Sequence, residues 1–297
     1  MQNVLVVFNN SSGKGIKRNS KKLIFNRLKS IPCKFKFVNI SCIENFLNID
    51  KYDTVIVVGG DGSLLKILPL IANSDKKLGI IPCGTANLFA ASLGIPDNIK
   101  KALEIIISGN TMEVDLGLAG NTYFSLRIGT GYDAEIINSS AGKLKQKFGY
   151  LAYLISGIKK CFKLPLKDYR LQIDENNMEL KANSIIVANA GNMFRKFFTI
   201  APNGSINDGQ LDIFILKARN FFDFAVIFFQ ILFNRHKNNS SVIYNQAKSI
   251  QIQTLEKNFH IDGETVTELP VNIRIVPKAI NVLVPLNRHP ELVSGSY

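Results

Sequence analysis

Tryptophan is absent from this chain of 297 residues, and cysteine and histidine are scarce. The three histidines are scattered along the sequence, so they form no cluster with a cysteine. The four cysteines also lack CxxC spacing: Cys33, Cys42, Cys83 and Cys161. A structural zinc site is therefore not predicted, and reduced thiols in a cytosolic protein are expected.

Long apolar runs are missing as well, since no window reaches the roughly eighteen apolar residues of a membrane-spanning helix. The first residues, Met1 to Asn3, lack the basic segment of a secretory signal. A Walker A motif does not occur either. We therefore expect a soluble protein, and any phosphate-binding segment must follow another pattern.

Basic residues are in excess: 36 lysines and arginines stand against 23 acidic residues, which gives a formal charge of +13 and a pI near 9.5. The hydrophobic content of 46% is typical of a globular protein with a large core. The charge favours an anionic partner, which could be a nucleotide, a nucleic acid or an acidic membrane face. Charge alone does not choose among them.

The most informative stretch is Val55–Lys66, where a buried strand meets a glycine turn. The four β-branched residues from Val55 to Val58 predict a strand covered on both faces. The glycines that follow let the backbone turn and bring N–H groups close to an anion. Ser63 suits the N-cap of a following helix, whose N-terminus favours phosphate. The stretch predicts a phosphate site.

Asp61 is unexpected in such a site because a lone carboxylate would repel phosphate. Three roles suit it: bridging through Mg²⁺, accepting a hydroxyl proton, or holding a neighbouring donor in place. Taken alone, GGDG is also compatible with an ordinary turn. The dipeptides Asp208-Gly209 and Asp262-Gly263, taken singly, likewise predict ordinary turns.

Strands alternate with helices up to residue 111. Further strand candidates are Val4–Phe8, Phe35–Ile40 and Leu78–Ile81. Residues 41–49 are predicted to be helical. A second helix is predicted over Asp97–Ile107, capped by Asp97 and ended by Gly109. The loop after the first strand should lie on the same sheet edge as the Gly59 turn. We expect a doubly wound α/β nucleotide-binding domain over residues 1–111.

From residue 112 short strands joined by turns predominate, which predicts a largely antiparallel β domain over 112–286. It is expected to be a β-sandwich whose last strand could return to the first domain, followed by a tail over 287–297. The strand candidates are Met112–Leu118, Thr122–Ile128, Tyr169–Ile173, Ser184–Ala190, Leu211–Leu216, Lys248–Thr254, Phe259–Ile261, Val271–Val276 and Ile280–Val284. Two helical segments interrupt it. Lys143–Lys167 is rich in lysine, and Asn220–Phe233 is almost wholly apolar. They are compatible with a solvated face and a core helix, or with a basic membrane-facing patch beside a wall for an acyl chain.

Six stretches together resemble one family, the diacylglycerol kinase catalytic-domain family of lipid kinases, which includes bacterial soluble diacylglycerol kinases and the sphingosine and ceramide kinases. They run in family order over most of the chain: Asn9–Gly15, Gly59–Ser63 (GGDGS), Gly84–Asn87 (GTAN), Val114–Gly117, Ala201–Asp212 (AP…DGQLD) and Asp262–Glu264 (DGE). Two positions depart from the family pattern. Asn10 replaces a proline, and Leu88 stands where many bacterial members have an acidic residue.

The resemblance implies ATP and Mg²⁺ between two domains, an NAD kinase/diacylglycerol kinase-like fold and a lipid hydroxyl as acceptor, most readily diacylglycerol. It implies Asp262 as general base, with Asp61 and Glu264 in the catalytic network. The residues implied to bind the nucleotide are Asn10, Gly59, Gly60, Gly62, Ser63, Gly84, Thr85 and Asn87. Those implied to hold a structural Mg²⁺ are Ser205, Asp208 and Gln210. The expected enzyme is cytoplasmic and peripherally membrane-associated, and it binds an anionic membrane surface transiently. No nucleic acid is expected as a partner, and a homodimer is possible.

Two other readings remain open. An NAD kinase-like enzyme shares GGDG and a two-domain plan, although the run Pro82–Asn87 matches the lipid kinases better. A catalytically decayed kinase that serves as an anionic-membrane-binding module is the non-enzymatic alternative. The acidic residues Asp61, Asp208, Asp262 and Glu264 are all present and argue against it.

Overall fold

The computed structural model describes residues 3–9, 18–46, 48–131, 134, 165–190, 204–232, 239–255, 259–266 and 272–286. The chain divides into two units, each described separately below. Unit 1 comprises Met1–Asp115 and Lys278–Leu292, and unit 2 comprises Leu116–Pro277 and Val293–Tyr297. Asn10, residues 143–164 of the lysine-rich stretch and residues 287–297 lie outside the described residues.

Unit 1 is built on a parallel sheet in the order β2-β1-β3-β4. Its strands are β1 (Asn3–Phe8), β2 (Lys34–Asn39), β3 (Thr54–Gly59) and β4 (Lys77–Pro82). Its helices are α1 (Arg18–Lys29), α2 (Asp61–Ile71), α3 (Leu88–Ser92) and α4 (Ile99–Ser108). Every residue of β3 is buried, which confirms the strand predicted from its β-branched run.

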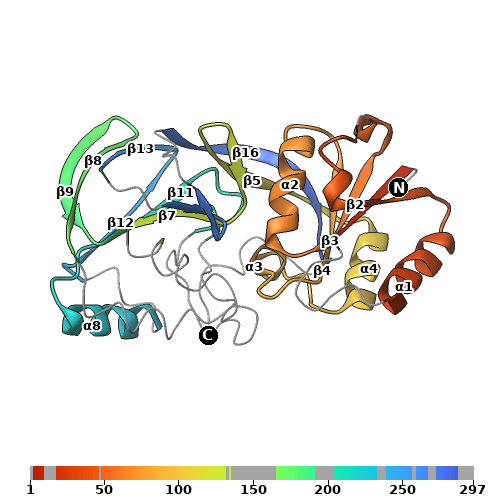
Figure 1. Ribbon diagram of the computed structural model, residues 1–297, viewed down its shortest axis with the longest axis horizontal. Coiled ribbons are helices and arrows are strands. Elements are labelled where there is room, and N and C mark those ends of the chain that lie inside the picture. The colour runs from red at the N-terminus through yellow and green to blue at the C-terminus, as the bar shows by residue number, and fades with distance from the viewer. Residues whose placement is uncertain are drawn as a thin grey trace. The chain divides into compact units, whose positions relative to one another are not determined.

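The helices of unit 1 cover both faces of the sheet. The crossover through α1 leads from β1 to β2, and that through α2 leads from β3 to β4 in the opposite direction. Because such crossovers are right-handed, α1 and α2 lie on opposite faces, and α4 contacts α1 (Figure 1). The doubly wound α/β fold is confirmed.

Two helix predictions in unit 1 need correction. The described residues of 41–49, which exclude residue 47, form no α-helix, and two 3₁₀ turns occur instead, η1 (Ile40–Cys42) and η2 (Ile49–Lys51). The Asn39 side chain accepts the Ser41 N–H and closes the first of these turns. The cap of α4 is Asn98, not Asp97, since its side chain accepts the N–H groups of Lys100 and Lys101. Gly109 ends α4 with φ +75°, as predicted.

Unit 2 is antiparallel, as predicted, with one sheet in the order β12-β11-β10-β7-β14-β15 and a second in which β13 pairs with β8 and β8 with β9. The strands that begin this part of the chain are β5 (Thr111–Ala119), β6 (Thr122–Phe124), β7 (Arg127–Gly131), β8 (Lys167–Ile173), β9 (Asn176–Ala182) and β10 (Ser184–Ala188). Those that follow are β11 (Leu211–Leu216), β12 (Val242–Ala247), β13 (Ser249–Gln253), β14 (Phe259–Ile261), β15 (Glu264–Val266) and β16 (Asn272–Leu283).

The last strand serves both units. Two separate strands were predicted around residues 271–284, but β16 is continuous over twelve residues. Its first part pairs antiparallel with β13, and its last part pairs parallel with β4. The C-terminal strand thus adds to the parallel sheet of unit 1.

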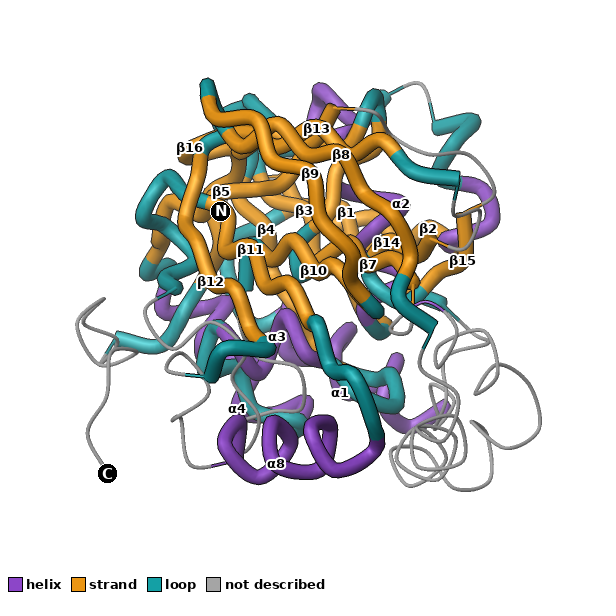
Figure 2. Tube along the Cα trace, turned by 90° about the vertical axis from the view of Figure 1, so that its left-hand side faces the viewer, coloured by secondary structure: helices purple, strands orange, loops and turns teal. Residues whose placement is uncertain are grey.

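The apolar segment predicted for Asn220–Phe233 is the helix α8 (Phe221–Leu232). Phe224, Ile227 and Ile231 pack on a buried cluster from β10, β11 and β12, and Figure 2 shows α8 lying against these strands. In the described part of the chain no helix is both long enough and apolar enough to cross a membrane.

Candidate active site

Three loops meet at the carboxyl edge of the parallel sheet in unit 1. Asn9, which follows β1, donates its backbone N–H to Val58 O at 3.1 Å, and its side-chain amide donates to Ser63 Oγ at 3.0 Å. Cys83, which follows β4, donates its N–H to Gly59 O at 2.8 Å. The ends of β1, β3 and β4 therefore lie side by side, as parallel strands with phosphate-type loops should.

Ser63 has a different role from the predicted helix cap. The cap of α2 is Gly60, and the helix begins at Asp61. Ser63 lies within the first turn, where it is buried and its hydroxyl accepts the Asn9 amide. The prediction of Ser63 as N-cap was wrong because glycine supplies the cap backbone and the serine links two loops instead.

The GGDG and GTAN loops touch through glycine. A Cβ on Gly84 would lie 2.6 Å from Gly60 Cα and 2.7 Å from Asn87 Oδ1, and a Cβ on Gly60 would lie 2.9 Å from Gly84 Cα. Non-bonded carbon atoms do not approach so closely, hence neither position accepts a side chain without movement of the other loop. This contact sets the spacing between the two predicted phosphate loops.

Asp61 performs the third of the roles left open by the sequence. Its carboxylate accepts the N–H of Leu88 at 3.0 Å and that of Phe89 at 3.1 Å, which are the first N–H groups of α3. A carboxylate at a helix N-terminus is stabilised by such donors. Because the contact at position 88 uses backbone, leucine in place of the family's acidic residue leaves it intact.

Asn87 closes the GTAN loop from inside. It is buried, has φ +50°, and its Oδ1 accepts the Gly84 N–H at 2.8 Å while its Nδ2 donates to Asp97 Oδ1 at 3.0 Å. Burial, with Asp97 nearby, raises the pKa of the Cys83 thiol above its usual value, so the loop adds no negative charge there. Thr85 and Ala86 are exposed, and Thr85 is the polar one of these two side chains.

Asp262 in unit 2 is held by four hydrogen bonds. Its Oδ2 accepts the Ser125 N–H at 2.7 Å and the Ser125 hydroxyl at 2.9 Å, and its Oδ1 accepts the N–H groups of Leu126 at 2.9 Å and Arg127 at 2.8 Å. The residue as a whole is partly exposed, whereas its carboxylate is enclosed by these donors. Burial raises the pKa of Asp262 above its usual value, and the hydrogen bonds oppose that rise.

The DGE motif forms the turn of a hairpin. Asp262 has φ +48° and Gly263 φ +85°, between the paired residues Ile261 and Glu264. Two left-handed residues make the two-residue turn that Asp-Gly favours, so the predicted turn is confirmed. Glu264 is exposed at the start of β15. Asp262 therefore lies in the turn of the hairpin, and Glu264 lies at the start of its second strand.

The predicted magnesium loop is closed on itself. Asp208 Oδ2 accepts the Ser205 N–H at 3.0 Å, its Oδ1 accepts the Gln210 N–H at 3.0 Å, and Ser205 Oγ donates to Asn207 Oδ1 at 2.7 Å. In the described ranges there is no group of three acidic, cysteine or histidine side chains that could hold a metal. The carboxylate, amide and hydroxyl oxygens of this loop are nevertheless the type of donor that a hard cation such as Mg²⁺ prefers.

A second carboxylate, Asp212, follows Asp208 four residues later in the chain. Asp212 is buried and accepts the Tyr244 hydroxyl and, at 3.1 Å, the Gln246 amide. Burial and the bond to Asp212, with the charge of Asp208 nearby, raise the pKa of Tyr244 above its usual value, so its hydroxyl remains a donor. Sequence reasoning missed this pair, because Tyr244 lies 32 residues from Asp212.

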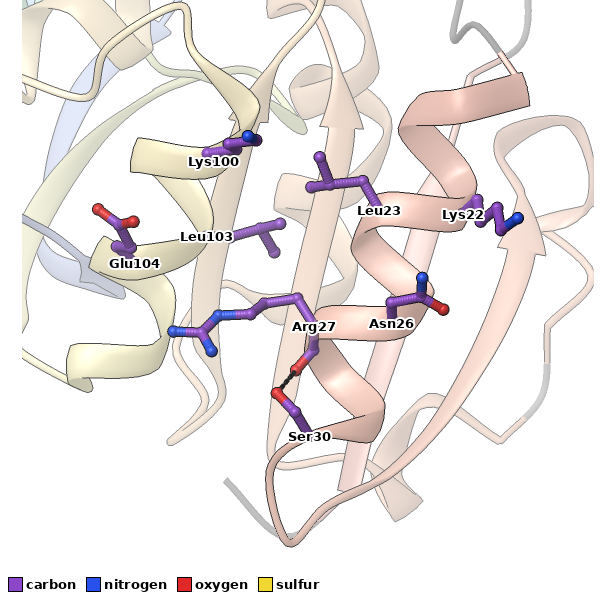
Figure 3. A pocket seen from close by; sticks show the side chains of 8 residues that line it. All are labelled: Lys22, Leu23, Asn26, Arg27, Ser30, Lys100, Leu103 and Glu104. Atoms are coloured by element: carbon purple, nitrogen blue, oxygen red, sulfur yellow. Dashed lines mark hydrogen bonds between the residues drawn. The ribbon is translucent and has the colours of Figure 1, made fainter.

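A hollow of about 520 Å³ in unit 1 does not belong to this site. Figure 3 shows the side chains that line it. It lies between α1 and α4 and is lined by Lys22, Arg27, Lys100 and Glu104 among others. None of the motif residues reaches it. The hollow therefore lies apart from the residues of the predicted site.

Comparison with known proteins agrees with the geometry. Residues 3–119 match the family model of the diacylglycerol kinase catalytic domain, and residues 127–284 match that of the YegS C-terminal NAD kinase beta sandwich-like domain. A diacylglycerol kinase of Staphylococcus aureus is 31% identical over 252 residues, which cover 84% of this chain and 80% of that protein. The uncharacterized protein sll0036 of Synechocystis sp. is 30% identical over 237 residues, but the match spans only 55% of its length.

A solved structure shares the fold along nearly the whole chain. The crystal structure of a diacylglycerol kinase from Bacillus anthracis superimposes with a TM-score of 0.79 at 26% identity, covering 96% of this chain and 98% of that one. The motif loops, the two-unit fold and these matches agree with one another. The chain therefore belongs to the diacylglycerol kinase family and is a lipid kinase of that type.

Proposed function

We propose that the chain transfers the γ-phosphoryl group of ATP to the hydroxyl of a lipid alcohol, with diacylglycerol as acceptor and phosphatidic acid as product. The observation that carries this proposal is the backbone contact of Gly60 with Gly84, which holds two glycine loops together at one sheet edge. Phosphoryl transfer depends mainly on such positioning.

Unit 1 would bind the phosphates of ATP. The first turn of α2 directs its N–H groups and the positive end of its dipole toward the loop edge. The negative charge of Asp61 is met by the N–H groups of α3, so it repels the polyphosphate less than an isolated carboxylate would. Thr85 adds an exposed hydroxyl donor.

Asp262 would accept the proton of the attacking hydroxyl. Three of its four donors are backbone N–H groups with fixed directions, and the fourth is the Ser125 hydroxyl, which can rotate. A substrate hydroxyl could take the place of that hydroxyl on Oδ2 and give up its proton there as its oxygen bonds to the γ-phosphorus and ADP leaves. The pKa of Asp262, raised by burial, suits a general base.

Magnesium would neutralise the developing charge on the phosphates, as in other phosphoryl transfers. Of the residues of this chain, Asp208 with its neighbouring loop oxygens would hold a structural cation.

We expect Mg²⁺ to raise the melting temperature of the protein, and Asp208→Asn to remove most of that rise without abolishing folding. Differential scanning fluorimetry with and without Mg²⁺ measures it. An unchanged response in Asp208→Asn would exclude this loop as the site.

The function is tested by following ³²P from γ-labelled ATP and Mg²⁺ into mixed micelles of single lipid alcohols: diacylglycerol, a monoacylglycerol or a sphingoid base, with NAD in a parallel reaction. We expect labelled phosphatidic acid, and little label with Asp61→Ala, which loosens α3. Labelled NADP would support the NAD kinase reading. Measurable ATP binding without transfer to any acceptor would support the decayed-kinase reading.

A further inference from the structure

Helix α8 is apolar on two sides. Its inner side, Phe224, Ile227 and Ile231, packs on the buried cluster of unit 2. Phe222, Val226 and Phe229 are spaced by four and three residues, which places them together on another side of the helix. We call these three residues the outer face of α8.

The outer face is exposed. Phe222 is 77% accessible, Val226 51% and Phe229 59%. The other large apolar side chains exposed in the described residues are distributed over the chain, for example Leu255 at 98% and Phe25 at 43%. Three such residues on one short helix make a contiguous apolar patch, and patches of that kind mark an interaction surface.

The charges around α8 indicate what would cover it. Lys217 and Arg219 precede the helix and Arg235 and Lys237 follow it in the sequence, whereas the segment 217–237 has a single acidic residue, Asp223. That carboxylate accepts the Arg219 N–H at 2.9 Å at the start of the helix. An apolar face between basic residues matches a bilayer with anionic headgroups. A second copy of the chain would bring like charges together, which disfavours it.

We propose that the outer face of α8 is a docking surface that inserts into the interface of a bilayer containing anionic lipids. This inference rests on the proposed function in one respect, because a diacylglycerol acceptor resides in that same bilayer. Phenylalanine and valine side chains would enter the acyl boundary while the charged groups of Lys217 and Arg219 remain at the headgroups.

The absence of tryptophan permits a direct test. Val226→Trp places a single reporter in the outer face, and Leu255→Trp places one at an isolated exposed position of the same unit. With phosphatidylglycerol-containing vesicles, and without ATP, we expect a blue shift and quenching by brominated acyl chains only for Val226→Trp. Pure phosphatidylcholine vesicles or high salt should weaken both signals. The absence of any response of Val226→Trp to vesicles would overturn the proposal. A blue shift that appears without vesicles and depends on protein concentration would also overturn it, because the outer face would then bind a second copy of the chain.

The double variant Phe222→Ser with Phe229→Ser should lower the vesicle partition coefficient by about tenfold or more, because both side chains would otherwise be removed from water. Its melting temperature should stay close to that of the parent because both residues are exposed. Activity toward a short-chain, water-soluble diacylglycerol should be retained and activity toward vesicle-borne diacylglycerol lost. Unchanged partition would refute the proposal, and vesicle binding without kinase activity would refute only the proposed function.

Discussion

Replacing Asp262 by asparagine should lower kcat by about 10²–10⁴-fold while ATP still binds, since that is the usual contribution of a positioned general base. The asparagine keeps the size of the side chain, and its oxygen can still accept two of the backbone N–H groups. Its amide group cannot accept a proton from the attacking hydroxyl. The measurement is steady-state transfer to diacylglycerol at saturating ATP, together with the dissociation constant of ATP.

The same substitution also affects folding, because the new amide group would face the Ser125 donors. Leaving the Ser125 N–H unsatisfied costs about 1–3 kcal/mol, so the melting temperature should fall as well. Asp174→Asn is the matched control: Asp174 has φ +49°, and its carboxylate accepts the N–H groups of Lys248 and Ser249 at another turn of unit 2. Wild-type turnover in Asp262→Asn, or an equal loss in Asp174→Asn, would contradict the base assignment.

Ser125→Ala separates the two contributions further. It removes the hydroxyl donor to Asp262 and leaves the three backbone N–H donors in place. If the substrate hydroxyl takes that position, the alanine variant retains turnover. A loss in Ser125→Ala comparable with that in Asp262→Asn would mean that the serine hydroxyl is itself required and that the proposed exchange of donors is incorrect.

The elements that the sequence predicted correctly are those whose signals lie within a few neighbouring residues. Four β-branched residues before a glycine turn are sufficient to predict β3, and Asp-Gly is sufficient to predict the turn at 262–263, because both signals lie within a few residues. The edge strand β9 was not predicted. Its segment Asn176–Ala182 mixes charged and amide side chains, and only its pairing with β8 makes it a strand. Polar strands of this kind carry little periodic signal.

The partners of the site residues lay beyond local reasoning. Ser125 and Asp262 are 137 residues apart, and Asp61 and Leu88 are 27 apart. The sequence predicted a continuous strand over Thr122–Ile128, but the chain is interrupted between β6 and β7, where its N–H groups turn to Asp262. Likewise Asp97 looked like a helix cap, whereas it accepts the Asn87 amide. A motif identifies the acidic residue, but only the fold identifies its donors.

Gly84→Ala should strongly impair the use of ATP. The added Cβ would lie 2.6 Å from Gly60 Cα. Because the backbone fixes the positions of both atoms, one of the two loops must move. Such overpacking costs about 1–3 kcal/mol of folding free energy. A displacement of about 1 Å in a positioning loop can lower the rate about 10²-fold. Calorimetric ATP binding and kcat/KM for ATP measure both effects.

Gly109→Ala supplies the control for that experiment. Gly109 ends α4 with φ +75°, and a Cβ there would find its nearest neighbour at 4.0 Å, so the substitution introduces left-handed backbone strain without a steric clash. We expect a lower melting temperature and unchanged ATP binding. If Gly84→Ala behaves like Gly109→Ala, the approach of the two glycine loops does not position the phosphates, and the nucleotide must then be held through other groups. If only Gly84→Ala loses ATP binding, the spacing between the GGDG and GTAN loops is itself the structural requirement for phosphoryl transfer.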